Sequence, residues 1–191
     1  MEQRISTKGL DKLYRDQAKR VGKSAIKGLV NENRLSERED RYKSIFLSHS
    51  HLDKTLVEKI ALLFRTIDTD IYIDWMDEAM PKVTDRNTAA KIKTKIENCH
   101  RFLFLATYAG LRSKWCDWEL GLAYSTKKID ELAILPIESR NGKWLGSEYL
   151  QLYPVMHVDE MDLAGTTADK VTIVKEGIPG SISLEQWLMF R

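Results

Sequence analysis

The chain has 191 residues, of which 43% are hydrophobic and 30% are charged, and its formal net charge is +2. This composition is typical of a soluble globular protein with one domain and an appendage, and it excludes an intrinsically disordered chain. The balanced charge argues against binding to nucleic acid, and no apolar run is long enough to cross a membrane.

The start of the chain and its cysteines indicate the compartment. No apolar run follows Met1, so we expect no secretory signal and a cytoplasmic location. The two cysteines, Cys99 and Cys116, form neither a disulfide framework nor a CxxC pair, which suits a reducing compartment. As lone thiols they are expected to be core residues rather than nucleophiles.

Residues 1–41 are predicted to be an N-terminal helical extension followed by a linker. Their apolar residues have the spacing of an amphipathic helix that breaks near Gly22 or Gly28. The charged run 33–41 reads as the linker. The apolar stripe needs a partner, and the sequence leaves three open: the main domain, a second copy of the chain, or another protein.

Residues 42–160 are predicted to form the main domain, because short apolar runs of strand type alternate there with amphipathic helices. The expected strands are 44–48, 71–74, 101–106, 132–137 and 153–158, and the expected helices are 56–67, 88–97 and 113–124. Asp53 is expected to cap the first of these helices. Five strands with short connections predict a doubly wound parallel sheet.

Residues 161–191 are predicted to be a C-terminal segment. The stretch 159–175 is polar with helical character, and 178–180 breaks it. Ser183 and Gln186 have the spacing of a capping box, which predicts a short helix containing Trp187. Because an exposed aromatic tail is unusual, we expect this helix to dock on the domain or on the first 41 residues.

The stretch 113–124 carries the strongest functional signal. Trp115 and Glu119 are four residues apart, so both lie on one face of the predicted helix. A carboxylate beside an indole at the edge of buried surface has the features of an active-site acid. The alternative is a solvated glutamate at an amphipathic boundary.

The topology brings further candidates to the same place. In doubly wound sheets, ligands bind beyond the carboxyl ends of the strands. Ser48 and His49 follow the first strand, Asp74 and Trp75 the second, and the Trp115 helix comes after the third. The chain has no GxGxxG, P-loop or GxSxG motif, and His49 and His51 lack partners with metal-ligand spacing, so we expect no metal site.

Three motifs, in this order, resemble the Toll/interleukin-1 receptor (TIR) domain family over residues 42–160. They are Ser44-Ile45-Phe46-Leu47-Ser48-His49-Ser50, Asp74-Trp75, and Ser113-Lys114-Trp115-Cys116-Asp117-Trp118-Glu119-Leu120. The resemblance implies a flavodoxin-like α/β fold with a five-stranded sheet. It also implies a mobile loop at residues 75–86 that family members use for self-association and for closing over substrate.

The resemblance is to the enzymatic branch of the family, which cleaves the nicotinamide-ribose bond of NAD⁺ and includes bacterial antiphage proteins. It implies that Glu119 is the catalytic glutamate of the WxxxE pattern. The substrate-binding candidates are Ser48 and His49 on the pocket floor, Asp74 toward the mobile loop or a ribose hydroxyl, Trp75 or Tyr108 stacking on a ring, and Trp115 shielding Glu119. The alternative for the three aromatic residues is a place in the core.

The match also has departures. His49 stands where relatives commonly carry an aromatic residue, and the loop near Met80 lacks a glycine that many members have. The resemblance further implies a downstream effector that senses the product, which is linear, cyclic or conjugated ADP-ribose.

The chemistry agrees with this placement of Glu119. Cleavage of the nicotinamide glycosidic bond builds positive charge on the ribose, which a carboxylate against one ribose face stabilises. Nicotinamide leaves as a neutral molecule, so the reaction needs no metal and no general acid. The resemblance thus implies that NAD⁺ is the substrate, and no cofactor is expected.

Two other functions fit the same fold. A non-catalytic TIR adaptor or scaffold would act by self-association alone, but it needs no carboxylate at Glu119. A receiver-like phosphoacceptor would use Asp74, but it needs a further acidic pair after the first strand. The chain has Ser48-His49-Ser50 there instead.

Overall fold

The computed structural model describes residues 5–22, 24–26, 28, 44–77, 80, 86–138, 148–159, 163, 165–175 and 177–189. Within these residues one sheet has eight strands. They are β1 (Ile5–Ser6), β2 (Ser44–Ser48), β3 (Asp70–Tyr72), β4 (Arg101–Ala106), β5 (Leu132–Glu138), β6 (Val155–His157), β7 (Thr172–Val174) and β8 (Ile182–Ser183).

The centre of this sheet is parallel. Strands β3, β2, β4, β5 and β6 lie side by side in that order, and each neighbouring pair is parallel. The order is the flavodoxin-like one, in which the chain winds outward in both directions from its first central strand. The predicted fold class, a doubly wound parallel sheet of five strands, is therefore confirmed. Beyond it, β7 and β8 add two antiparallel strands at the β6 edge.

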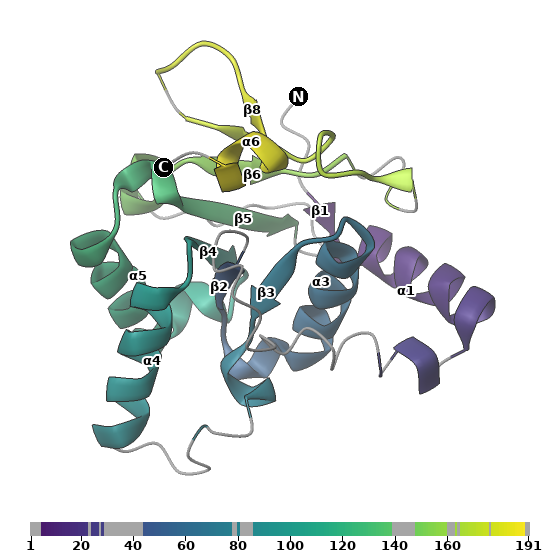
Figure 1. Cartoon of the computed structure of the whole chain (residues 1–191), viewed down its shortest axis with the longest axis horizontal. Helices are drawn as coiled ribbons and strands as arrows, with labels where there is room; N and C mark the ends of the chain where they lie inside the picture. The colour runs from purple at the N-terminus through teal and green to yellow at the C-terminus, as the bar shows by residue number, and fades with distance from the viewer. Residues whose placement is uncertain are drawn as a thin grey trace.

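Helices cover both faces of the sheet (Figure 1). The α-helices are α1 (Thr7–Val21), α3 (Lys54–Thr66), α4 (Arg86–Asn98), α5 (Lys114–Thr126) and α6 (Leu184–Met189). The 3₁₀ turns are η2 (His51–Asp53), η3 (Asp74–Met76), η4 (Gly110–Arg112), η5 (Ile129–Glu131) and η6 (Glu148–Leu152). None of the helices in the described ranges is long and apolar enough to span a membrane.

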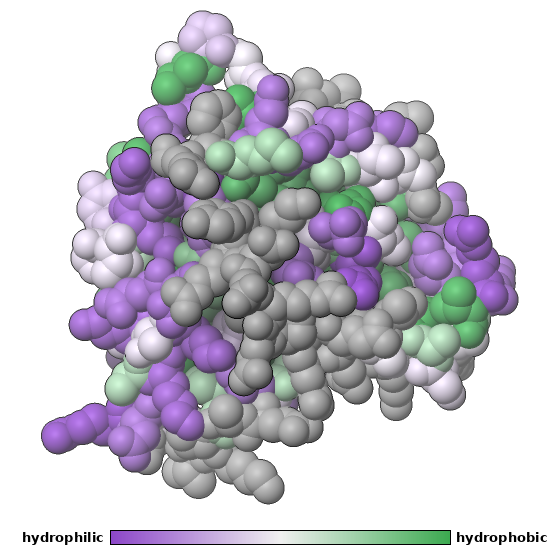
Figure 2. Space-filling view, in the orientation of Figure 1, coloured by the Kyte–Doolittle hydropathy of each residue, from purple (hydrophilic) through white to green (hydrophobic). Residues whose placement is uncertain are grey.

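Two hydrophobic clusters fill the space between the sheet and its helices. The first joins the sheet to α1, α3 and α6, and the second joins it to α4 and α5. The coloured residues on the face shown in Figure 2 are mostly hydrophilic, with hydrophobic residues in separate patches. The apolar stripes predicted from the sequence are thus used to build the core on both faces of the sheet.

The N-terminal helix packs on the domain itself. Leu10 and Leu13 of α1 are buried in the first cluster, and Asp11 forms an ion pair with Lys59 of α3. Before the helix, β1 pairs with the end of β5, Ile5 lying opposite Ile137. The helix ends at Gly22, whose φ of 85° is a conformation that favours glycine. The apolar stripe therefore finds its partner in the main domain.

Two local expectations are wrong. The side chain of Asp53 does not cap α3, because its carboxylate accepts a hydrogen bond from the Thr107 hydroxyl instead. Part of the stretch expected to have helical character, Thr172–Val174, is strand β7. Its three residues are all β-branched, which favours a strand over a helix, and the polarity of the surrounding stretch concealed this signal.

The C-terminal helix is built as predicted. The Gln186 backbone N–H donates to Ser183 Oγ at 3.1 Å, and the Ser183 N–H donates to Gln186 Oε1 at 3.0 Å, which completes the capping box. Trp187 is buried in the first cluster, so the helix docks on the domain. The three-segment division into 1–41, 42–160 and 161–191 stays a prediction, and the expected linker at 33–41 lies outside the described residues.

Candidate functional site

The candidate site lies at the carboxyl edge of the parallel sheet. Ser48 is the last residue of β2 and pairs with Phe104 of β4, while Asp74 begins the η3 turn after β3. After β4, the η4 turn leads directly into α5, which carries Glu119. The doubly wound order places β2 between β3 and β4, so the three connections that follow these strands meet at one edge.

Glu119 is fixed by the way α5 begins. Ser113 caps the helix, with its Oγ accepting from the Cys116 N–H at 3.3 Å. One turn later Glu119 points into the protein, with only 3% of its surface exposed. Trp115 is half-buried in the second cluster, and its ring lies 5.0 Å from that of Trp118. A glutamate that the sequence could have placed at a solvated boundary is therefore in the interior.

The Glu119 carboxyl group has a close hydrogen-bond donor in Ser48. The hydroxyl of Ser48, itself 1% exposed, donates to Glu119 Oε2 at 2.6 Å. Burial, together with the nearby charge of Asp74, raises the pKa of Glu119 to about 8, although hydrogen bonds from the Ser48 hydroxyl and the Trp115 indole lower it. At neutral pH the free protein therefore holds Glu119 mostly protonated.

His49 and Asp74 form a second pair beside this one. The His49 side chain is buried, and its Nδ1 lies 2.8 Å from the Leu47 carbonyl oxygen. Its other nitrogen, Nε2, lies 3.5 Å from Asp74 Oδ1. The same Asp74 oxygen accepts the Trp75 backbone N–H at 2.8 Å. Four of the residues expected at the site, Ser48, His49, Asp74 and Glu119, are thus brought together.

The two other aromatic candidates differ in their surroundings. Trp75 follows Asp74 and is half-buried against the first cluster, with Lys54 Nζ 5.4 Å from its ring centre. Its indole Nε1 is buried and has no hydrogen-bond partner among the described residues. Tyr108 is 61% exposed, and its ring faces the Arg112 guanidinium at 5.4 Å. No contact among the described residues joins Tyr108 to Glu119 or Asp74.

The sequence did not reveal the link between the first and third loops of the site. Thr107 donates to Asp53 Oδ2 at 2.6 Å, and its hydroxyl accepts the Gly110 N–H at 2.9 Å. Gly110 is required there, because a Cβ would lie 2.6 Å from the Leu105 carbonyl oxygen. Burial raises the pKa of Asp53, and the Thr107 hydroxyl and nearby His49 lower it. Asp53 and Thr107 are 54 residues apart, and no local pattern connects them.

Cys116 also borders the site. Its thiol is buried, and burial raises the pKa of the thiol to about 12, so it stays protonated. This favours the core role expected of it over a nucleophilic one. The described part of the predicted mobile loop is limited to Trp75–Asp77, Met80 and Arg86, and the rest of the loop, with Lys82 and Asp85, lies outside the described residues.

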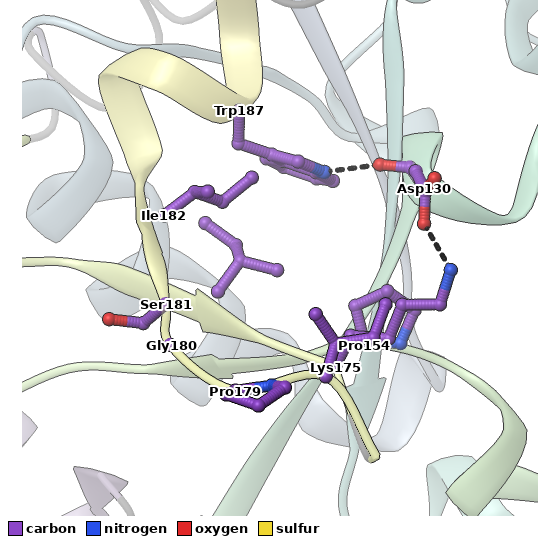
Figure 3. Close-up of a pocket in the computed structure, with 10 residues that line it drawn as sticks. Asp130, Pro154, Lys175, Pro179, Gly180, Ser181, Ile182 and Trp187 are labelled. Atoms are coloured by element: carbon purple, nitrogen blue, oxygen red, sulfur yellow. Dashed lines mark hydrogen bonds and ion pairs between the residues drawn. The ribbon is translucent and has the colours of Figure 1, made fainter.

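A cavity of about 250 Å³ lies elsewhere, beneath the β7–β8 hairpin (Figure 3). Its lining is mostly apolar, and Asp130 borders it. The Asp130 backbone carbonyl oxygen accepts the Trp187 indole N–H at 2.6 Å, and the Asp130 carboxylate pairs with Lys175 at 2.7 Å. Neither Glu119 nor Asp74 lines it. We assign the site by the buried ionisable groups rather than by this cavity. In the described ranges, no cluster of three or more His, Cys, Asp and Glu side chains is arranged to hold a metal ion.

Comparison with known proteins agrees with the motifs. A family model described as "TIR domain" matches residues 45–166. The "Probable 3' cyclic ADP-D-ribose synthase ThsB'" of Bacillus cereus (strain MSX-D12) is 26% identical over 174 residues, covering 87% of this chain and 83% of that protein. The "Putative cyclic ADP-D-ribose synthase TIR2" of Cytobacillus dafuensis is 29% identical over 79 residues, covering 40% of this chain and 21% of that protein.

Proposed function

The chain belongs to the TIR domain family, and we propose that it cleaves the nicotinamide-ribose bond of NAD⁺ with Glu119 as the catalytic carboxylate. One observation carries this proposal. Glu119 is buried at the carboxyl edge of the sheet, where its carboxyl group accepts the Ser48 hydroxyl at 2.6 Å. A solvated or purely structural glutamate has no reason to occupy this position. The names of both similar proteins, cyclic ADP-D-ribose synthases, support the same activity.

The environment of Glu119 suits a cationic substrate. Burial penalises the ionised carboxyl group, which is why the pKa of Glu119 is raised to about 8. The nicotinamide ring of NAD⁺ carries a positive charge, and a cation beside the carboxyl group favours its ionised form. As the glycosidic bond breaks, positive charge moves onto the ribose, and the carboxylate stabilises it in surroundings that exclude water. Nicotinamide leaves as a neutral molecule.

The other site residues take binding roles in this proposal. Ser48 holds the Glu119 carboxylate in place, Trp115 shields it, and His49 fixes Asp74 at the next strand. The buried Trp75 indole N–H lacks a partner, and an unpaired buried donor is costly, so it is available to an acceptor atom of NAD⁺. Tyr108 is exposed and would stack only on a part of the substrate that extends to the surface. NAD⁺ is the substrate, and the proposed reaction uses no further cofactor.

The relatives' names support a cyclic form of ADP-ribose as the product. The use of that product is proposed from the resemblance to the enzymatic TIR branch. We propose that the product is a cyclic form of ADP-ribose, that a downstream effector senses it, and that the pathway acts in bacterial antiphage defence. We place the reaction in the cytoplasm, since NAD⁺ is an intracellular metabolite and both thiols, Cys99 and Cys116, are free and buried.

Self-association is part of the proposal. TIR surfaces and the 75–86 loop are the proposed contacts, and activity per molecule should rise as copies assemble. Nicotinamide release per molecule, followed over about a hundredfold range of protein concentration alongside sedimentation, tests this. Constant specific activity with no change in sedimentation would contradict it.

The function itself is tested with the purified full chain and NAD⁺. Free nicotinamide is followed by chromatography, and the second product is weighed by mass spectrometry, since cyclic and linear ADP-ribose differ by one water molecule. We expect nicotinamide release with a cyclic product. No release at any protein concentration would overturn the enzymatic function and leave the adaptor as the remaining TIR role.

A further inference from the structure

Resting on the proposed NAD⁺ cleavage, we propose that Asp74 is the general base of the reaction and that His49 is the residue that positions it. The base accepts the proton of the hydroxyl that attacks the ribose after, or as, nicotinamide leaves. This assigns to Asp74 a chemical step that neither Glu119 nor Ser48 performs. The inference rests on the contacts of the His49 ring, on the Asp74 oxygen that has no partner among the described residues, and on the different exposure of the Asp74 and Glu119 carboxyl groups.

The His49 ring is oriented by the backbone. A carbonyl oxygen only accepts hydrogen bonds, so His49 Nδ1, 2.8 Å from the Leu47 oxygen, must carry a proton. In neutral histidine the remaining nitrogen, Nε2, is then an unprotonated acceptor. It lies 3.5 Å from Asp74 Oδ1, and two acceptors facing each other repel. When Nε2 is also protonated, the contact becomes an ion pair that holds the Asp74 carboxylate in place.

This contact leaves one oxygen of Asp74 free. Oδ1 accepts the Trp75 N–H at 2.8 Å and faces His49, so both interactions fall on the same oxygen. The other oxygen, Oδ2, has no hydrogen-bond partner among the described residues. The Asp74 side chain is 31% exposed, whereas that of His49 is 4% exposed. The Asp74 carboxylate is therefore accessible to a substrate hydroxyl or a water molecule, whereas the imidazole is not.

Glu119 is unsuited to the same task. One of its oxygens is held by Ser48, and only 3% of its surface is exposed. Its carboxyl group is in position to stabilise charge on the ribose, but a proton delivered to it would remove that charge. Two carboxyl groups with different exposure thus divide the work: the buried one acts electrostatically, and the accessible one accepts the proton.

The chemical step balances as follows. The oxygen of the attacking hydroxyl, from water or from a second ribose of the same NAD⁺, bonds to the anomeric carbon. The carbon–nitrogen bond breaks, and its electron pair neutralises the pyridinium nitrogen of nicotinamide. The hydroxyl proton moves to Asp74 Oδ2 and from there to solvent. One positive charge enters on NAD⁺ and one proton leaves, so no oxidant, reductant or metal is required.

The charged groups around Asp74 determine how its substitution should change the pH dependence of the reaction. Among the described residues, acidic groups near the His49–Asp74 pair include Asp53 of η2, Asp77 after η3 and Glu119 of α5, and Lys54 lies over Trp75. Removing the Asp74 charge should lower the pKa of Glu119, which shifts the pH midpoint of kcat/KM downward. That shift alone would leave the high-pH plateau of kcat unchanged. Loss of a general base lowers the plateau itself.

The decisive experiment compares Asp74→Asn with the wild-type chain for nicotinamide release across pH 6–9, with and without azide. General-base catalysis is worth about a hundredfold or more, so we expect the kcat plateau of Asp74→Asn to fall by about that factor. Azide attacks the anomeric carbon without having a proton to lose. It should therefore restore nicotinamide release in Asp74→Asn and give ADP-ribosyl azide, but it should not restore Glu119→Gln.

Matched variants separate positioning from folding. Asp70, at the opposite end of β3, serves as the carboxylate control, and Asp70→Asn should keep wild-type activity. His49→Asn can still donate to the Leu47 oxygen but has no atom at the Nε2 position, so kcat should fall about tenfold. His49→Gln can place its amide near the Nε2 position and donate to Asp74, which should recover most of that loss.

The outcomes discriminate cleanly. A wild-type plateau in Asp74→Asn, or a lowered plateau that azide does not restore, would overturn the role of Asp74 as the base. Equal losses in His49→Asn and His49→Gln would overturn the positioning role of His49. These results differ from a failure of the proposed function, in which the wild-type chain itself would release no nicotinamide.

Discussion

Arg101 and Glu119 are both buried ionisable side chains, but they lie at opposite edges of the sheet and differ in the groups that surround them. Arg101 begins β4 and is 1% exposed. Its Nε donates to the Trp187 carbonyl oxygen at 2.7 Å, a second nitrogen donates to the His100 oxygen at 3.1 Å, and its guanidinium lies 5.5 Å from the Trp187 ring centre. At the amino edge, therefore, the buried charge is matched by acceptors and by an aromatic face.

Glu119 at the carboxyl edge is less well matched. Its closest donor is the Ser48 hydroxyl, and the neighbouring Asp74 carries charge of the same sign. Burial lowers the pKa of Arg101 and raises that of Glu119, yet arginine keeps its charge while glutamate at a pKa of about 8 gives its charge up at neutral pH. The difference teaches that the amino edge is built for stability, whereas the carboxyl edge keeps a group whose charge a cationic substrate can restore.

The largest expected effect comes from removing the charge of Glu119. Glu119→Gln keeps the size of the side chain and an acceptor for Ser48, so the fold should survive. Loss of a preorganised electrostatic contact in a buried site costs about a hundredfold to a thousandfold in rate, and we expect nicotinamide release to fall by at least that factor. Circular dichroism controls for folding. A folded variant with wild-type turnover would contradict the catalytic role of Glu119.

Substitution of Arg101 at the amino edge should lower the stability of the fold and leave the rate of NAD⁺ cleavage unchanged. Arg101→Met fills similar space but leaves the carbonyl oxygens of Trp187 and His100 without their donor. Removing the buried guanidinium from its hydrogen-bond acceptors should lower the free energy of unfolding by about 3 kcal/mol. A shift of the urea midpoint at constant slope would measure this loss. The rate per folded molecule should stay unchanged, because Arg101 and the site lie at opposite ends of β4. A variant that stays stable but loses activity would contradict the division between the two edges.

The elements of this comparison were not equally visible in the sequence. The strands 44–48 and 101–106 have the bounds that their apolar runs predict, because strands buried on both faces are continuous in hydrophobicity. The position of Glu119 also follows from local spacing, since one helix carries both it and Trp115. The antiparallel strands β7 and β8 were not predicted, because they are only 3 and 2 residues long and lie in polar surroundings.

Contacts between distant residues were beyond sequence reasoning. The bond between Ser48 and Glu119 spans 71 residues, and the pairing of Arg101 with Trp187 spans 86. Motif order placed Ser48 and Glu119 at one edge, but only the packing of α5 on β2 and β4 shows that their oxygens meet. Arg101 gave no signal at all, since an arginine at the start of a strand is usually solvated.

A smaller effect sharpens the role of Ser48. The ionised form of Glu119 is the active one, so kcat/KM should rise with pH around a midpoint near its pKa of about 8. The Ser48 hydroxyl lowers that pKa, and Ser48→Ala should move the midpoint upward by about one pH unit. The measurement is the pH profile of nicotinamide release at low NAD⁺. Thr126→Ala, at the exposed end of α5, is a control that should leave the midpoint in place.

The smallest expected effect is the pH dependence of stability. Glu119 has a pKa of about 8 when folded, against a reference value of 4.5, so the folded chain keeps a proton that the unfolded chain releases. Below pH 4.5 Glu119 is protonated in both the folded and the unfolded chain, so its ionisation does not lower the free energy of unfolding. As pH rises from there toward 8, the free energy of unfolding falls.

Glutamine does not titrate, so the free energy of unfolding of Glu119→Gln should not fall in this way. Its advantage over wild type should therefore grow by about 1 kcal/mol when the pH is raised from 5 to 6. Arg101→Met should show no such pH-dependent difference from wild type in this range, because arginine stays charged in both states. Urea unfolding of the three proteins at both pH values measures the difference, and a Glu119→Gln curve parallel to wild type would mean that the folded protein does not raise the pKa of this carboxyl group.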